Sequence, residues 1–128
     1  MVSKMRSERI ADRIREELSE MLIQEISDPR LTGVTITDVT IDREIAYAEI
    51  FFSALEGAQR SEEILDGFVH AQGYLRRELA QRIKLRVFPR LRFHWDPTNE
   101  RAEKIEKLIA SLHHPQESAG DNEVKQDV

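Results

Sequence analysis

The strictest alternation of apolar and polar side chains in this chain runs from Leu85 to Trp95. Since successive side chains of a strand point to opposite faces, the pattern predicts a strand with one apolar face and one basic face. The apolar face would carry Leu85, Val87, Pro89, Leu91, Phe93 and Trp95. The opposite face would carry Arg86, Phe88, Arg90, Arg92 and His94. Because proline cannot donate to a β ladder, Pro89 makes this an edge strand or interrupts it locally.

Two further strands are predicted upstream, and a short turn joins them. Val34–Ile41 is rich in Val, Ile and Thr. In Ile45–Ser53, apolar residues at every second position place their side chains on one face. The apolar positions of the first strand change parity near Asp38, which indicates a bulge or an offset strand end. The turn Asp42–Glu44 is short, so the two strands are expected to form an antiparallel hairpin.

Helices are predicted before the hairpin and after the third strand. The first has a cap at Ser3 or Ser7 and ends near Asp28, because the residue before Pro29 disfavours the α region. Its apolar positions recur at helical spacing: Ile10, Ile14, Leu18, Met21 and Leu22. The last helix starts at Asp96–Pro97, with Asp as the cap and Pro in the first turn. Its apolar positions are Ala102, Ile105, Leu108, Ile109 and Leu112.

The segment between the hairpin and the third strand predicts a helix, a kink and a second helix. Ser61 caps its start, and acids follow in the first turn. Glycine lowers helix stability by about 1 kcal/mol relative to alanine, so Gly67 and Gly73 weaken an uninterrupted helix. The kink is placed at Ala71, Gln72 and Gly73, and the apolar stripe resumes with Leu75, Leu79 and Ile83.

This order of elements predicts an α+β fold: helix, two strands, kinked helix pair, third strand and final helix. The sheet would have three strands, be mixed, and carry helices on one face. A chain of 128 residues suits one domain, which we place at residues 1–112. Residues 113–128 are polar and acidic, and we expect them to form a disordered tail.

Composition excludes several classes of function. There is no cysteine, which removes disulfides, thiolate catalysis and Cys-based zinc sites. No signal-peptide core or membrane span is present, so we expect a cytoplasmic protein with no membrane partner. The four histidines lack the spacing of a metal site, and no serine lies in a nucleophile elbow. We therefore expect no enzyme activity, no cofactor and no metal.

The charge distribution points to a partner. The segment from Arg76 to Arg92 has a net charge of +6 in a chain of net charge −5. Its cations are Arg76, Arg77, Arg82, Lys84, Arg86, Arg90 and Arg92, and its one acid is Glu78. One acid cannot pair seven cations, so we expect the segment to bind nucleic acid or ribosomal RNA. Three more cations share a face of the first helix and either extend this surface or are ordinary solvated residues: Arg6, Arg9 and Arg13.

Other interpretations of this segment stay open. The basic strand could dock an acidic protein partner or add an edge strand to another protein. Phe88 could stack on a base or be a half-buried aromatic under the final helix, while Trp95 is expected in the core. An RNA-processing enzyme is disfavoured, because no catalytic set of residues is present.

Together these features resemble the type II KH fold and, in detail, the ribosome-binding factor A family. Four motifs in order carry the resemblance over about residues 5 to 112. They are the Asp-Pro-Arg turn in Ile26–Leu31, the hairpin of Val34–Val39 with Ala46–Phe52, the Ala-x-Gly kink at Ala71–Gly73, and the strand Leu85–Asp96 with Pro before Leu-x-Phe. Where the family more usually has an acidic residue, this chain has Arg90.

The resemblance implies an assembly factor that binds the precursor small ribosomal subunit through its rRNA near the decoding region. It implies help in late maturation, including processing of the rRNA 5′ end, without being the nuclease. It also implies release by a GTPase and a link to growth in the cold; we expect a monomer. Ala71 adds a side chain where KH domains bring the backbone close to nucleic acid, so we expect readout of shape and phosphates rather than of sequence.

Overall fold

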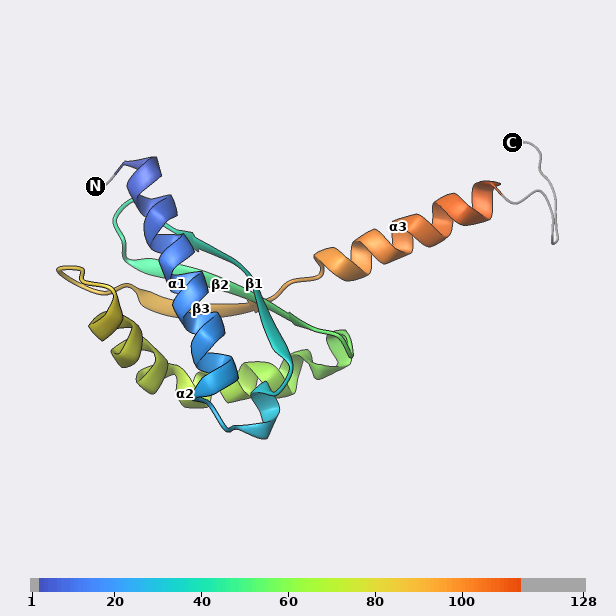
Figure 1. The fold of residues 1–128 in the computed structure, drawn as a ribbon. Helices are drawn as coiled ribbons and strands as arrows, with labels where there is room; N and C mark the ends of the chain where they lie inside the picture. Colours follow the sequence, from blue (N-terminus) through green and yellow to red (C-terminus); the bar gives the residue numbers. More distant parts are fainter. Residues whose placement is uncertain (1–2, 114–128) are drawn as a thin grey trace. The chain divides into compact units, whose positions relative to one another are not determined.

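A computed structural model describes residues 3–113 of this protein. The elements in order are α1 (Lys4–Gln24), η1 (Pro29–Leu31), β1 (Val34–Ile41), β2 (Tyr47–Ala54), η2 (Ala58–Arg60), α2 (Ser61–Arg82), β3 (Arg90–Trp95) and α3 (Thr98–His113) (Figure 1). They fall into two compact units, one reaching Asp96 and one beginning at Pro97. The boundary predicted after residue 112 stays a prediction, and residues 114–128 of the expected tail lie outside the described part.

The three strands form one sheet in the order β1-β2-β3. β1 pairs antiparallel with β2, and β2 pairs parallel with β3, so the sheet is mixed as predicted. The register shifts between Ile36 and Asp38, which is the bulge that the change of parity indicated. A parallel pair needs a long crossover, and α2 supplies it. Since β3 comes last in the strand order, it lies at the sheet edge, where Pro89 just before the strand is tolerated.

The core lies between the sheet and the helices α1 and α2. Fully buried side chains come from all of these elements: Ile14, Leu18 and Met21 of α1, Ala48, Ile50 and Phe52 of β2, Ile64, Phe68, Leu75 and Leu79 of α2, and Leu91 of β3. Phe68 stacks on Phe93 with ring centroids 4.4 Å apart, and Trp95 meets the edge of Phe52. Trp95 is thus packed against the core, as expected.

α1 begins where the sequence predicts but ends earlier. The Ser3 hydroxyl accepts a hydrogen bond from the Arg6 amide at 3.1 Å, which caps the helix. The predicted end near Asp28 is wrong, because α1 stops at Gln24. Asp28 instead starts η1, where its Oδ1 accepts the Arg30 amide at 2.9 Å and its carboxylate pairs with the Arg30 guanidinium. This pairing lowers the pKa of Asp28 from 3.8 to about 2.

α2 is one helix from Ser61 to Arg82, and its ribbon changes direction partway along (Figure 1). The predicted kink is therefore a bend within one helix rather than a loop between two. Gly67 has a packing role, since a Cβ atom there would lie 2.9 Å from Cδ2 of Leu31 and 3.1 Å from Cβ of Arg30. A Cβ at Gly73 would meet nothing within 4 Å.

β3 is shorter than the alternating pattern predicts. It starts at Arg90 rather than Leu85, and Val87 is 69% exposed although its parity placed it in the core. Phe88 turns inward instead and is 7% exposed. Two facts explain the difference: the partner strand β2 has its first parallel pair at Tyr47 and Arg90, and Pro89 has no amide to donate.

The second unit contains α3, which starts at Thr98 close to the predicted position. The Arg101 amide donates to the Pro97 carbonyl at 3.0 Å and closes its first turn. The predicted apolar stripe is present, but its members are exposed on this helix: Ile105, Leu108, Ile109 and Leu112.

Candidate nucleic-acid interface

The seven cations between Arg76 and Arg92 do not form a single face. Three of them make hydrogen bonds or ion pairs inside the fold: Arg76, Arg82 and Arg92. The other four are exposed, and none of them makes an ion pair within residues 3–113: Arg77, Lys84, Arg86 and Arg90. The sequence segment thus divides into a structural set and a set available to a partner.

Arg76 fixes the loop between α2 and β3. Its guanidinium donates to the carbonyl of Phe88 at 2.6 Å and to the carbonyl of Pro89 at 3.0 Å. These carbonyls lie just before β3, where the chain is not paired with β2. Buried backbone carbonyls require a hydrogen-bond donor, and Arg76 supplies the one that a neighbouring strand would otherwise provide. Phe88 anchors the same loop in the core, which excludes the role of base-stacking residue.

Arg82 joins the two core helices. Its guanidinium pairs with Glu17 of α1 at 3.4 Å and with Glu25, the residue that follows α1. The hydrogen bond that Arg82 donates to Glu25 is the main cause that raises the pKa of Arg82. Arg13 belongs to this cluster, because it donates to the Arg82 carbonyl at 3.2 Å and lies 3.5 Å from Glu17. Arg82 and Arg13 therefore hold α1 against α2.

Arg92 lies on the face of the sheet opposite the buried side chains of Leu91 and Phe93. Its guanidinium carbon stands 3.8 Å from the centre of the Tyr47 ring, a cation–π geometry. It also donates to Glu49, which lowers the pKa of that carboxyl. Glu49 accepts a second contact at 2.6 Å from His94. This neighbouring acid reduces the positive charge that the strand presents.

The acids that pair these arginines were missed by reasoning from the sequence. Counting acids only between Arg76 and Arg92 found Glu78, whereas the structure adds Glu17, Glu25 and Glu49. Glu49 faces Arg92 because β2 and β3 pair in that register. No local pattern carries this information, since the two residues meet only after the parallel crossover has formed.

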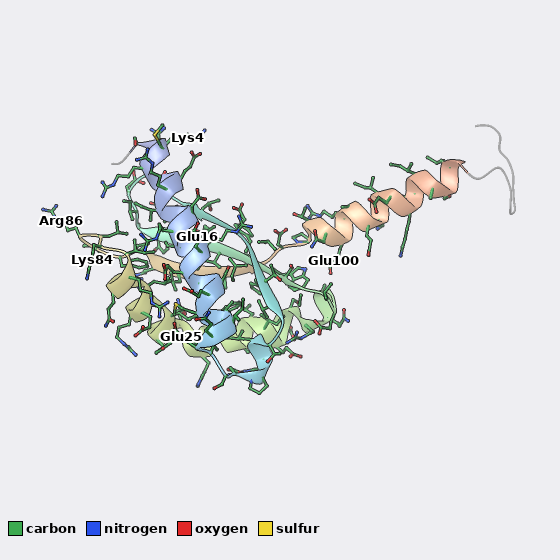
Figure 2. All side chains as sticks on the ribbon, viewed as in Figure 1. Lys4, Glu16, Glu25, Lys84, Arg86 and Glu100 are labelled. Carbon is green, nitrogen blue, oxygen red and sulfur yellow. The ribbon has the colours of Figure 1, made fainter. Side chains whose placement is uncertain are left out.

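The four exposed cations lie on the second half of α2, on the loop after it, and at the start of β3. Figure 2 shows Lys84 and Arg86 on that loop, with the Arg86 side chain extending away from the fold. The Arg90 amide donates to the Ala46 carbonyl at 2.9 Å, which ties the loop to the hairpin. A surface of this kind can meet phosphates without first breaking internal ion pairs.

Arg6 joins this surface through a shared hollow. The hollow has a volume of about 410 Å³ and is lined by Arg6 of α1, residues 44–46 of the hairpin turn and residues 85–87 of the loop. Arg9 is exposed and contacts the sulfur of Met5 at 3.4 Å. Of the three cations that the sequence analysis selected on α1, Arg6 therefore lines the hollow, Arg9 is exposed on the helix, and Arg13 is engaged with α2.

The hairpin turn beside this hollow has an unusual backbone. Ile45 has a φ of 56°, a left-handed conformation that costs a β-branched residue roughly 1–3 kcal/mol. Asp42 holds the turn, because its Oδ1 accepts the amides of Ala46 and Tyr47 at 2.9 and 2.8 Å. The Tyr47 amide is the main cause that lowers the pKa of Asp42. Residue type gives no signal for this conformation, so sequence reasoning did not find it.

The three residues of the predicted kink, Ala71, Gln72 and Gly73, have different surroundings. Ala71 packs against the core, and Gln72 donates from Nε2 to the Leu91 carbonyl at 2.8 Å. Gln72 thus links α2 to β3. Gly73 is exposed and has open space beside it. Neither packing nor a positive φ therefore requires glycine at this position.

Among residues 3–113, no group of three or more histidine and acidic side chains is arranged to hold a metal ion. No helix within the same range is long and apolar enough to cross a membrane.

Comparison with known proteins agrees with these motifs. A sequence model described as ribosome-binding factor A matches residues 6–109. A ribosome-binding factor A from Aromatoleum aromaticum is 41% identical over 104 residues, covering 81% of this chain and 82% of that protein. One from Acinetobacter baylyi is 41% identical over 133 residues, covering 94% of this chain and 98% of that protein.

Solved structures share the fold. The crystal structure of ribosome-binding factor A from Thermus thermophilus is 26% identical with a TM-score of 0.61, covering 69% of this chain and 93% of that one. The solution structure of a Thermotoga maritima relative is 27% identical with a TM-score of 0.62, covering 73% and 90%. With both sequence and fold in agreement, the chain belongs to the ribosome-binding factor A family.

Proposed function

We propose that this protein binds the precursor small ribosomal subunit through its rRNA and promotes late maturation without catalysis. The observation that carries the proposal is a set of exposed cations that make no ion pair among the described residues 3–113, namely Arg77, Lys84, Arg86 and Arg90. Family membership supports it, since the relatives are named as ribosome-binding factors. A Thermus thermophilus ribosome-binding factor A has been fitted into a cryo-EM map of a 30S complex.

The physical basis is phosphate neutralisation. Cations that bind phosphates release counterions, so affinity falls as salt rises, with a slope of roughly −0.7 to −0.9 per phosphate. The four exposed cations together with Arg6 would give a slope of about −3.5 to −4.5. Arg76, Arg82 and Arg92 contribute indirectly, because they hold the loop, the helices and the strand in place.

The bend in α2 belongs to this surface. An RNA backbone can approach Gly73 closely, whereas the side chain of Ala71 is packed inward and reads no base. The readout is therefore one of shape and phosphates. Strong preference for a short single-stranded sequence in a binding assay would contradict this part of the proposal.

The finer parts of the proposal follow from the family rather than from geometry. They are binding near the decoding region, support of rRNA 5′-end processing, a role in growth in the cold, and release by a GTPase. The protein would act as a monomer in the cytoplasm. Mapping the rRNA 5′ end in a deletion strain tests the role in processing. Following the protein on subunits after a GTPase is added tests its release.

The direct test is co-sedimentation of the full chain with immature small, mature small and large subunits. We expect selective pelleting with small-subunit particles, and loss of pelleting in the double variant Arg77→Glu, Arg86→Glu. Arg15→Glu is the control for charge reversal elsewhere, because Arg15 is also exposed and lies on α1 outside the cluster. Equal binding by all three proteins would refute the site, and pelleting with every particle alike would refute the specificity.

Docking of an acidic protein remains the competing interpretation of the same cations. β3 is an edge strand, but the Leu91 carbonyl is already taken by Gln72, which hinders addition of a further strand. Nuclease treatment of the particles separates the two interpretations. Binding that survives complete digestion of the RNA would favour the protein partner.

A further inference from the structure

The hollow between α1, the hairpin turn and the loop after α2 is more than a charged surface. Its volume of about 410 Å³ falls within the roughly 300–1,000 Å³ typical of sites for small ligands. Arg6 and Arg86, which make no ion pair in the part of the chain that the structure describes, line it together with Glu44. Apolar side chains of Ile45, Leu85 and Val87 line it as well, and Val87 is 69% exposed. Exposed apolar groups beside arginines match the chemistry of a nucleotide, which has a flat base and a phosphate.

Each wall of the hollow is held in place by contacts outside it. Asp42 fixes the hairpin turn through two amides, with Ile45 in its left-handed conformation. Arg76 and the buried Phe88 fix the loop on the other side. A hydrogen bond of 2.9 Å from the Arg90 amide to the Ala46 carbonyl ties the two walls together. A ligand would therefore enter a preformed site and lose little affinity to ordering of the protein.

We propose that this hollow accepts one unpaired nucleotide extruded from the bound RNA. Its base would lie against Ile45, Leu85 and Val87, and its flanking phosphates would meet Arg6 and Arg86. Glu44 can accept a hydrogen bond from an exocyclic amino group of the base. The inference rests on the proposed RNA-binding function and adds to it a preference for helices that carry a bulge.

The test compares two fluorescently labelled RNA hairpins with the same stem, one fully paired and one with a single bulged 2-aminopurine. Anisotropy with the full-length protein at one salt concentration gives both affinities. We expect the bulged hairpin to bind about tenfold more tightly, within the range for burial of one base. The 2-aminopurine fluorescence should also change on binding, because the base moves from water to an apolar wall.

Two substitutions at Val87 make the test specific. Val87→Ser removes the apolar contact and should abolish the preference for the bulge, whereas Val87→Tyr should increase it. Val69→Ser is the matched control, since Val69 is 58% exposed on α2 and does not line the hollow. Arg86→Gln should weaken binding to both hairpins, and more strongly to the bulged one, because Arg86 also meets the phosphates that flank the extruded nucleotide.

Equal affinity of the unaltered protein for the two hairpins overturns the inference. So does an equal loss of the preference in Val87→Ser and Val69→Ser. Co-sedimentation with small subunits, measured on the same protein preparation, separates the nucleotide site from the proposed function. Subunit binding without a bulge preference refutes the nucleotide site alone, while absence of subunit binding refutes the proposed function.

Discussion

Two glycines of α2 should respond in opposite directions to alanine. At Gly67, a new Cβ would lie 2.9 Å from Cδ2 and 3.1 Å from Cγ of Leu31, and 3.1 Å from Cβ of Arg30. Leu31 is itself 3% exposed and cannot swing into solvent. Overpacking of this kind costs about 1–3 kcal/mol, against a helix-propensity gain of about 1 kcal/mol. We expect Gly67→Ala to destabilise the fold by about 1 kcal/mol.

At Gly73 the same substitution meets open space. Only the propensity gain remains, so Gly73→Ala should stabilise the protein by about 1 kcal/mol. The two variants should therefore differ by about 2 kcal/mol in urea unfolding, or by roughly 8–16 °C in Tm for a domain of this size. If Gly67→Ala unfolds at or above the unaltered protein, the close packing of α2 on η1 is wrong.

Gly73→Ala should weaken binding to small subunits although it stabilises the fold. If RNA approaches the exposed glycine, the added methyl group should weaken co-sedimentation with small subunits in a protein that is more stable. A variant that is both more stable and fully active would show that Gly73 lies outside the interface.

Three further predictions concern the loop and the turn. Arg76→Met should destabilise the fold by about 1–3 kcal/mol in urea, because two backbone carbonyls lose their donor; an unchanged midpoint would contradict the clamp. Phe88→Ala should lower the free energy of unfolding by about 3–5 kcal/mol, while Val87→Ala should change it by no more than about 0.5 kcal/mol. Equal effects would support the predicted strand that begins at Leu85. The depressed pKa of Asp28 contributes stability above pH 3.8 that is lost as pH falls toward about 2. Asp28→Asn should remove that part of the acid dependence in unfolding curves, and an unaltered profile would disprove the ion pair.

The sequence predicted those features that depend on local pattern. The change of parity near Asp38 predicted a bulge or an offset strand end, and the structure has the bulge. Ser3 and Ser7 were the two predicted caps of α1, and the structure has the cap at Ser3. The edge position of β3 followed from Pro89. The length of β3 did not, because a strand extends only as far as its partner, and β2 offers no partner before Tyr47.

The candidate site was predicted in composition but not in arrangement. A run of cations identifies a segment that can bind a polyanion, yet it does not reveal which cations acquire partners from elsewhere. Arg82 and Arg92 are paired by Glu25 and Glu49, which lie far away in the sequence. Conversely, Arg6 reaches the hollow beside Arg86 only through the packing of α1 against the sheet.

The central claim is that the exposed cations, rather than the whole basic segment, bind rRNA phosphates. The most direct measurement is the salt dependence of the affinity for purified small subunits. We expect a slope of log K against log salt of about −3.5 to −4.5, which becomes shallower by about 1.4–1.8 in Arg77→Gln, Arg86→Gln. A slope near zero, or one that the double variant leaves unchanged, would contradict the claim.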